Sequence, residues 1–136
     1  MQRQIKFRGK RIDNGEWAYG YYFESFTGIH YILALHDHIL GMTEFYEVDP
    51  ATVGQYTGIK DKNGIETCAG DIVRYGVNYE RINKIVFEQG CFQLQGNGGL
   101  APLRYHHLLD SNTLDVIAIG NIYDNPELLE GGKTDV

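Results

Sequence analysis

The sequence predicts a mainly β protein: a small barrel or strongly curled antiparallel sheets, with an SH3-like barrel as one form, one short helix and helical turns. Short apolar or alternating runs recur along the chain, and clusters of Gly, Asn and Asp separate them. Gly58, Gly64 and Gly70 place three turn points close together, which suits strands that bend sharply. With 136 residues and 43% hydrophobic side chains, the chain can bury a core of its own.

The first half of the chain contains the most aromatic strand. Trp17, Tyr19, Tyr21 and Phe23 alternate with other residues, so they share one face of that strand. Residues 5–8 alternate apolar with basic side chains, which is typical of a half-buried strand. The elements expected here are strands at 5–8, 17–23, 29–35 and 44–48, turns at 13–15, 27–28 and 49–52, and a loop at 36–43.

A hairpin signal lies in the middle of the chain. Asn63-Gly64 tolerates the positive φ angles of a two-residue primed turn, and apolar residues flank it on both sides. Gly70 and Asp71 form a second turn, after which Ile72 begins a strand. Turn chemistry accounts for this whole stretch. A phosphate-binding loop would need a helix after the glycines, and no helical pattern follows.

The second half contains the segment that is long enough to be a candidate helix, at 102–110. Pro102 suits a first helical turn, and Leu103 and His107 are spaced to stack on one helix face. Asn125, with proline after it, reads as the cap of a helical turn. The other elements expected here are strands at 72–75, 81–87, 91–95 and 115–119, a connector at 76–80 and a flexible segment at 96–99.

No linker, repeat or low-complexity segment divides the chain, so we expect one domain. The expected domain covers 1–136, with sub-lobes of roughly 1–50 and 51–130, a barrel around 53–95, an N-terminal sheet of residues 3–48 packed on it, a buried strand at 115–122 and a frayed tail at 131–136.

The net charge of −6 gives no overall attraction to nucleic acid or to an anionic membrane surface. The charge is uneven, because residues 1–12 hold five of the twelve Lys and Arg side chains and no acid. We interpret this basic start as the solvated face of an edge strand, with a phosphate contact as the alternative. The two cysteines do not give the pattern of a disulfide-stabilised protein. No signal peptide or membrane-spanning segment is recognisable in the sequence. We therefore expect the protein to be located in the cytoplasm.

The aromatic stripe from Trp17 to Phe23 has two interpretations. We favour a stripe that faces the core, because the net negative charge weakens the case for nucleic acid. The alternative is an exposed platform on which unstacked bases lie, with basic residues alongside. For an exposed stripe, the candidate binding surface comprises Arg8, Lys10, Arg11, Trp17, Tyr19 and Tyr21.

The sequence assigns no catalytic, cofactor-binding or metal-binding residue. His36 and His38 would share one face of a strand and could hold a metal, but the spacing nominates no further ligand among Cys68, Cys91 and Asp49. We favour a polar loop with incidental histidines. Either cysteine could pair with a distant histidine as a nucleophile, although cysteine is more often a small core residue.

Five stretches of the chain resemble YopX-like proteins of bacteriophages and prophages, in the order in which that family has them. They span both ends and the middle, so the resemblance covers nearly the whole chain and extends to the prophage protein for which the family is named. Before Gly70 the family commonly has Ile-Tyr-Glu where this chain has Thr67-Cys-Ala69, which argues against an essential acid at Ala69. The five stretches are Ile5–Trp17, Thr52–Gly58, Asp61–Gly64, Gly70–Val73 and Ile119–Leu129.

The resemblance implies a mainly β fold that contains a barrel, a phage or prophage origin and a host-cytoplasm setting, and it brings no catalytic residues to this chain. We expect a non-enzymatic module that binds a protein partner of host or phage, or a second copy of itself, without a cofactor or a membrane. One alternative is a nucleic-acid-binding barrel that uses the basic N-terminal strand. The other is a metal-dependent hydrolase that acts through His36 and His38.

Overall fold

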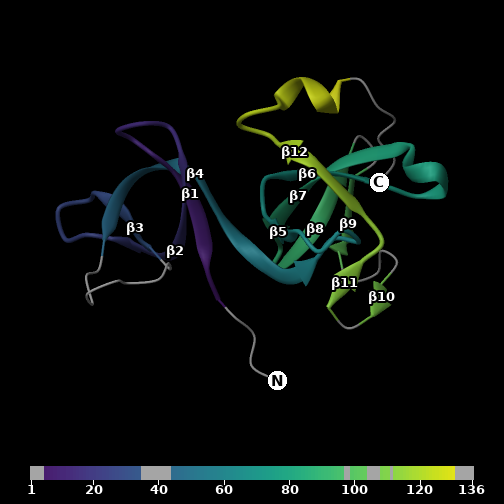
Figure 1. Ribbon diagram of the computed structural model, residues 1–136, viewed down its shortest axis with the longest axis horizontal. Coiled ribbons are helices and arrows are strands. Elements are labelled where there is room, and N and C mark those ends of the chain that lie inside the picture. Colours follow the sequence, from purple (N-terminus) through teal and green to yellow (C-terminus); the bar gives the residue numbers. More distant parts are fainter. Residues whose placement is uncertain (1–4, 35–43, 97–98, 104–107, 111, 131–136) are drawn as a thin grey trace. The chain divides into compact units, whose positions relative to one another are not determined.

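The computed structural model describes residues 5–34, 44–96, 99–103, 108–110 and 112–130 (Figure 1). The chain is mainly β, as predicted, and its described helical segments are short 3-10 turns. Its residues form two compact units, Met1–Tyr56 and Thr57–Val136. Each unit is built around its own cluster of buried apolar side chains. The expectation of one domain, with sub-lobes that meet near residue 50, stays a prediction.

The N-terminal unit is a ring of four antiparallel strands. These are β1 (Phe7–Arg11), β2 (Trp17–Glu24), β3 (His30–Ala34) and β4 (Phe45–Lys60), of which β4 contributes its first part here. Each strand pairs with the next, and β4 also pairs with β1, which closes the ring (Figure 1). Strand β2 takes part in the ring with its two halves, since Trp17–Gly20 pairs with β1 and Gly20–Glu24 pairs with β3.

The core of this ring is a small cluster of buried side chains. Ala18, Ile32 and Val48 are buried together in it, and the half-buried rings of Phe7, Tyr22 and Tyr46 pack against them. A Cβ atom added to Gly9 would lie 3.1 Å from the Cβ of Val48 and 3.2 Å from a methyl of Val53. The strands are therefore packed closely around Gly9.

The aromatic stripe of β2 lies on the outside of the ring. Tyr19, Tyr21 and Phe23 are exposed, while the alternate residues Ala18 and Gly20 are buried and Tyr22 packs half-buried against the core. The interpretation that this stripe faces the core is wrong. The predicted period of two is correct, but the other set of alternate residues faces the core.

Strand β4 is longer than expected. The sequence predicts a short strand at 44–48 and a turn at 49–52, whereas β4 continues to Lys60. Asp49 does form local turn bonds, because its carboxylate accepts the Ala51 N–H at 3.0 Å and its carbonyl accepts the Thr52 hydroxyl at 2.6 Å. The Thr52 Oγ1 in turn accepts the N–H of Lys10 at 2.9 Å. The predicted turn is thus a local irregularity within the β1–β4 pairing, where the register shifts.

The C-terminal unit contains a five-stranded antiparallel sheet in the order β12–β6–β7–β8–β9 and, beside the end of β4, the short strands β5, β10 and β11 (Figure 1). Val73, Ile85, Leu94, Leu114 and Val116 form the centre of its core. The strands are β5 (Glu66–Cys68), β6 (Asp71–Tyr75), β7 (Arg81–Glu88), β8 (Cys91–Gly96), β9 (Gly99–Pro102), β10 (Leu108–Asp110), β11 (Thr113–Leu114) and β12 (Ile117–Asn121), with 3-10 turns η2 (Val77–Tyr79) and η4 (Pro126–Leu129).

The strand ring lies elsewhere in the chain than expected. The sequence predicts a barrel around 53–95, whereas the ring closed by strand pairing is formed within residues 7–55. Closure depends on β1 pairing with β4, as in the contact of Phe7 with Gln55. The prediction rested on turn residues, which indicate pairing between strands that are adjacent in the chain. They give no information on a pairing between strands as far apart as β1 and β4.

The central hairpin is confirmed, but its turn is of another type. The N–H of Gly64 donates to the Asp61 carbonyl at 3.0 Å, and the N–H of Asp61 donates to the Ile65 carbonyl at 2.7 Å. Within this turn only Gly64 has a positive φ, at 83°, so Asn63 does not take the left-handed conformation of a primed turn. The loop is therefore a tight turn followed by a left-handed glycine. The Asp61 carboxylate favours it by accepting the N–H groups of Asn63 and Ile65.

The helix predicted at 102–110 is wrong at both ends of that range. Pro102 ends strand β9, and Leu108–Asp110 is strand β10. Leu103, between them, is buried in the core of the C-terminal unit in a 3-10 conformation, and His107 lies outside the described residues. One apolar pair at helical spacing is therefore weak support for a helix of this length.

The helical turn predicted after Asn125 exists, with Asn125 at the N-cap position and Pro126 next. The Asn125 side chain makes no capping bond to η4, however. Its Oδ1 instead accepts the N–H of Asn121 at 3.3 Å, and so closes the turn that precedes η4. An Asn side chain can accept a hydrogen bond from a backbone N–H group that precedes or follows it in the chain. Its residue type alone therefore does not predict which of these bonds it makes.

The turn between β7 and β8 offers a test of turn chemistry. Gln89 and Gly90 both have positive φ, at 55° and 78°, in the two-residue loop between the paired residues Glu88 and Cys91. Asn tolerates this conformation better than Gln. We expect Gln89→Asn to raise the free energy of unfolding in urea by about 0.5–1 kcal/mol, as partial relief of left-handed strain. Gln89→Ala is the control and should give no gain; an equal gain would contradict the explanation.

Candidate functional site

The outer side of β2, β3 and β4 carries a continuous set of large apolar side chains. Residues paired across neighbouring strands point to the same side, so Tyr21, Leu33 and Phe45 form one row. Phe23 and Tyr31 form the next row in the same way. We call this surface the aromatic face; its residues are Tyr19, Tyr21, Phe23, Tyr31, Leu33 and Phe45.

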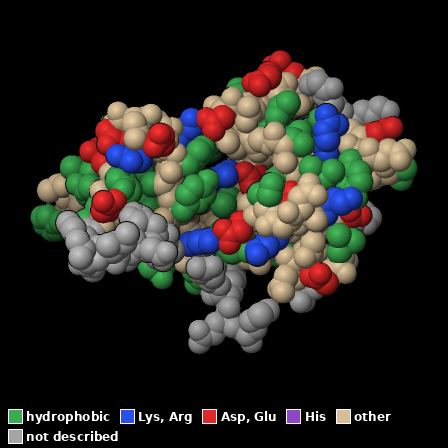
Figure 2. Space-filling view, viewed as in Figure 1, with side chains coloured by type: hydrophobic (Ala, Val, Ile, Leu, Met, Phe, Trp, Pro, Cys, Tyr) green, Lys and Arg blue, Asp and Glu red, His purple; other side chains and the backbone are tan. Residues whose placement is uncertain are grey.

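The aromatic face is open to solvent. The exposed fraction is 48% for Tyr19, 53% for Tyr21, 39% for Phe23 and 56% for Phe45. The ring of Phe23 stacks on Tyr31 with centroids 5.4 Å apart and meets Phe45 edge-on at 5.7 Å. The side chains therefore form one contiguous apolar patch and are not scattered singly. Figure 2 shows hydrophobic side chains at the surface of the N-terminal unit, with Asp and Glu side chains among them.

The turn between β2 and β3 extends this apolar surface. Phe26, in that turn, is fully exposed, and Ile29 follows it just before β3. The turn itself is held by local bonds, since the N–H of Ile29 donates to the Ser25 hydroxyl and the N–H of Ser25 donates to the Ile29 carbonyl. A fixed turn presents Phe26 at low cost in conformational entropy, which favours a role in contact with another molecule.

The basic side chains of β1 lie over the chain's own aromatic rings. Arg8 is 4.7 Å and Lys10 is 5.5 Å from the ring centroid of Trp17. Arg11 lies 4.0 Å from the ring centroid of Tyr46. Arg8 is paired with Tyr19 and Lys10 with Trp17, so these four side chains lie on one side of the β1–β2 pair, together with Tyr21. Of the predicted binding surface, Arg11 is the residue that lies apart, against Tyr46.

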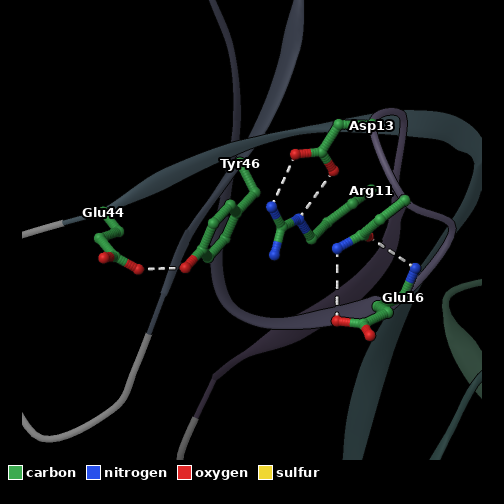
Figure 3. Close-up of polar contacts among 6 residues, drawn as sticks. Arg11, Asp13, Glu16, Glu44 and Tyr46 are labelled. Carbon is green, nitrogen blue, oxygen red and sulfur yellow. Dashed lines mark hydrogen bonds and ion pairs between the residues drawn. The ribbon is translucent and has the colours of Figure 1, made fainter.

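Arg11 is the centre of a polar cluster at the β1–β2 turn (Figure 3). Its Nε and Nη2 donate to the two carboxylate oxygens of Asp13 at 2.9 and 2.7 Å. These bonds hold the pKa of Asp13 below its ordinary value and raise the pKa of Arg11. On the other side of the guanidinium, the Tyr46 hydroxyl donates to Glu44, and that bond raises the pKa of Tyr46. The charge of Arg11 is therefore compensated within the chain.

The C-terminal unit has a polar cluster of its own. The Lys62 ammonium donates to the Tyr79 hydroxyl at 2.8 Å, and that hydroxyl donates to the Asp115 carboxylate at 2.6 Å. The bond to Tyr79 raises the pKa of Lys62. Tyr79 has a positive φ of 53°, which is unusual for a bulky residue. The cluster joins the hairpin turn, η2 and the segment before β12, so it explains why this conformation is retained.

The histidine pair cannot be placed, because His36 and His38 lie outside the described residues. Among the residues that are described, no three His, Cys, Asp or Glu side chains lie where they could share a metal ion. Cys68 is buried and Cys91 is exposed. The metal-dependent alternative therefore stays a prediction.

Sequence reasoning missed three members of the aromatic face, Tyr31, Leu33 and Phe45. Each lies in a predicted strand. In β3 the half-buried Tyr31 and Leu33 alternate with the buried Ile32, but all three are apolar, so the sequence does not show which of them face outward. What the sequence did not contain was the pairing of these strands with β2. Phe23 was recognised as part of the stripe but not included in the candidate surface.

Comparisons with known proteins find one matching family model and solved structures of similar fold. The family model described as "YopX protein" matches residues 6–130. No curated protein matches the chain. Protein EF1440 from Enterococcus faecalis has a similar crystal structure, with a TM-score of 0.53, 23% identity, and coverage of 94% of this chain and 99% of that one. Protein yopX from Bacillus subtilis is similar with a TM-score of 0.56, 16% identity, and coverage of 97% and 100%.

These similarities to solved structures concern the fold. At 16% identity this chain is not the Bacillus protein itself, although the two share the fold over 97% of this chain. Within the described residues, none of the helical segments has the length and apolar character needed to span a membrane.

Proposed function

The chain belongs to the YopX protein family, and from this premise we propose that it is a non-enzymatic binding module that docks a protein partner on its aromatic face. The exposed aromatic face supports this proposal. Large contiguous apolar patches are uncommon on soluble monomers and mark interaction surfaces. Tyr and Phe are also enriched at protein interfaces, where Tyr often carries much of the binding free energy.

The backbone beneath the face supports the proposal as well. Tyr21 and Phe45 lie on strands of a closed ring, whose backbone N–H and C=O groups bond to neighbouring strands. A site on paired strands keeps its side chains in place better than a site on loops. Little order then has to be created when a partner binds, which favours affinity.

The nucleic-acid alternative finds less support. Stacking of bases needs an open aromatic ring beside uncompensated cations. Arg8 and Lys10 lie over the indole of Trp17, and Arg11 is bound by both oxygens of Asp13. The net charge of −6 adds a general repulsion of phosphate.

We also propose that the protein acts in the cytoplasm of a bacterial host, as a product of a phage or prophage. The resemblance of the sequence to phage and prophage proteins motivates the origin. The exposed thiol of Cys91 suits a reducing compartment, since exposed thiols oxidise readily outside one.

A comparison of surface variants tests the proposed function. The purified protein, the double variant Tyr21→Ser/Phe45→Ser and the control Phe87→Ser are each immobilised and exposed to nuclease-treated host lysate. Phe87 is a matched control because it is 52% exposed on a strand of the C-terminal unit. A protein retained by the wild type and the control should be lost with the double variant, and its purified form should bind the double variant at least about thirtyfold more weakly.

Two results would overturn this proposal. One is a set of retained proteins that is the same for all three baits, which would show that the aromatic face does no binding. The other is a purified partner whose dissociation constant is equal for the wild type and the double variant. Urea unfolding of each bait must show an intact N-terminal unit, because both substituted side chains are exposed and should contribute little to stability.

A further inference from the structure

The second half of β2 has an edge at which no described strand is paired. Strand β2 pairs with β1 as far as Gly20. Ile5, which would lie opposite Tyr22 if that pairing continued, is 56% exposed and belongs to no strand. From Tyr21 to Glu24, β2 therefore pairs with β3 on one side and, within the part of the chain that the structure describes, with no strand on the other. We call this other side of Tyr21–Glu24 the open edge.

The backbone groups at the open edge follow from the hydrogen bonds of the β2–β3 hairpin. The N–H of Ser25 donates to the Ile29 carbonyl at 2.8 Å, so Ser25 and, two residues earlier, Phe23 direct their N–H and C=O groups toward β3. Because these directions alternate along a strand, Tyr22 and Glu24 direct theirs to the open edge. Such groups are a template for pairing with another extended chain.

The two edges of the five-stranded sheet carry features that discourage such pairing. Strand β9 is four residues long and ends in Pro102, which has no N–H. At the opposite edge, the N–H of Ala118 in β12 is bound by the Asp61 carboxylate at 3.0 Å. Between Tyr21 and Glu24, β2 contains no proline or lysine and keeps an unbroken register with β3. The open edge therefore lacks the usual protection of an edge strand.

The aromatic face borders the open edge on the outer side of the sheet. In a strand added there, the residues opposite Tyr21 and Phe23 point to that outer side and cover the exposed flanks of the two rings. The residues between them point to the inner side. There they meet polar groups, because the Tyr22 hydroxyl is hydrogen-bonded to Nδ1 of His30 and the Glu24 carboxylate lies 3.9 Å from Nε2 of the same ring. The edge thus fits a strand that is apolar on one side and polar on the other.

We infer that the protein partner binds as an added β-strand: an extended segment with apolar side chains at alternate positions pairs with the open edge at Tyr22 and Glu24. This inference rests on the proposed function and specifies how the aromatic face is used. The backbone bonds orient the segment and contribute affinity, and the contacts of its alternate side chains with Tyr21 and Phe23 give specificity. A helical segment has its backbone groups bonded internally, so the open edge selects an extended one.

A displayed random-peptide library tests this inference on the full-length protein. Peptides are selected on the wild type and counter-selected on Tyr21→Ser/Phe45→Ser, so that ligands of the aromatic face remain. A synthetic peptide of the most frequent sequence is then methylated at one backbone nitrogen at a time. In an added strand alternate N–H groups face β2. We therefore expect methylation to weaken binding about tenfold or more at every second position of the paired segment and about twofold or less at the positions between.

The variant Glu24→Pro tests the same edge from the side of the protein. The Glu24 N–H points to the open edge, so proline removes a donor there and leaves the bonds to β3 in place. The matched control is Glu24→Ala, which removes the carboxylate and keeps the N–H. We expect the peptide to bind Glu24→Pro at least about tenfold more weakly than Glu24→Ala. Urea unfolding of both variants checks that the N-terminal unit is intact.

The outcomes separate the inference from the proposed function. Face-dependent peptides whose methylation shows no alternation, or which bind Glu24→Pro and an intact Glu24→Ala equally well, would overturn the added strand and keep the binding module. A library that yields no face-dependent peptide would overturn both. A dimer in sedimentation equilibrium that Glu24→Pro abolishes and Glu24→Ala retains would also overturn the inference, because it would assign the open edge to a second copy of the chain.

Discussion

Replacing Asp61 by Asn is expected to lower the free energy of unfolding of the C-terminal unit by about 3 kcal/mol. The Asp61 side chain is fully buried, and its two carboxylate oxygens accept three backbone N–H groups. One oxygen accepts those of Asn63 and Ile65 at 2.9 and 2.8 Å, and the other accepts that of Ala118 at 3.0 Å. An amide has only one oxygen, so in either orientation its NH2 group faces a buried N–H donor and leaves it without an acceptor.

The measurement is urea unfolding of the wild type and two variants. Asp110→Asn is the matched control, because Asp110 is exposed and its carboxylate accepts, among the described residues, the N–H of Asn112 in the same kind of local turn. The amide oxygen can keep that single bond, so the control should lose no more than about 0.5 kcal/mol. Equal losses in the two variants would contradict the role assigned to the bond between Asp61 and Ala118.

Asp61 also shows which hydrogen bonds can be predicted from the sequence and which cannot. Its type and position predict a turn, and the turn exists, because an Asp side chain bonds N–H groups two to four residues along the chain. The bond to Ala118 spans 57 residues. No local pattern contains such a bond. The same limit applies to the closure of the N-terminal ring, where Phe7 meets Gln55.

For the candidate surface, the sequence predicted which residues of β2 share a side of the strand, but not which side is exposed. The alternation in β2 correctly placed Tyr19 and Tyr21 on one side of the strand, together with Phe23. Which side is inside depends on the width of the ring, and this width is set by how many strands close it. Here the alternate residues Ala18, Gly20 and Tyr22 are on the side of the buried cluster, with Tyr22 half-buried against it. The exposed stripe is the consequence.

The second large effect is expected at Gly96, at the end of β8. A Cβ atom added there would lie 2.5 Å from the Oδ1 and 3.1 Å from the Cγ of Asn83. Asn83 is fully buried and donates its Nδ2–H to the Tyr75 hydroxyl at 2.6 Å, so its carboxamide cannot move without weakening that bond. We expect Gly96→Ala to lower the free energy of unfolding of the C-terminal unit by about 2–3 kcal/mol, as an overpacked core site does.

A double-mutant cycle distinguishes this contact from a general effect of alanine. Where the backbone allows it, Gly→Ala stabilises a protein by about 0.4–1 kcal/mol, because it restricts the unfolded chain. In an Asn83→Ala background the obstructing carboxamide is absent, so adding Gly96→Ala should cost little or become favourable. The coupling free energy between the two sites should then be about 2 kcal/mol, measured from four urea titrations. A coupling near zero would mean that Gly96 is required for its backbone conformation and not for the space that Asn83 occupies.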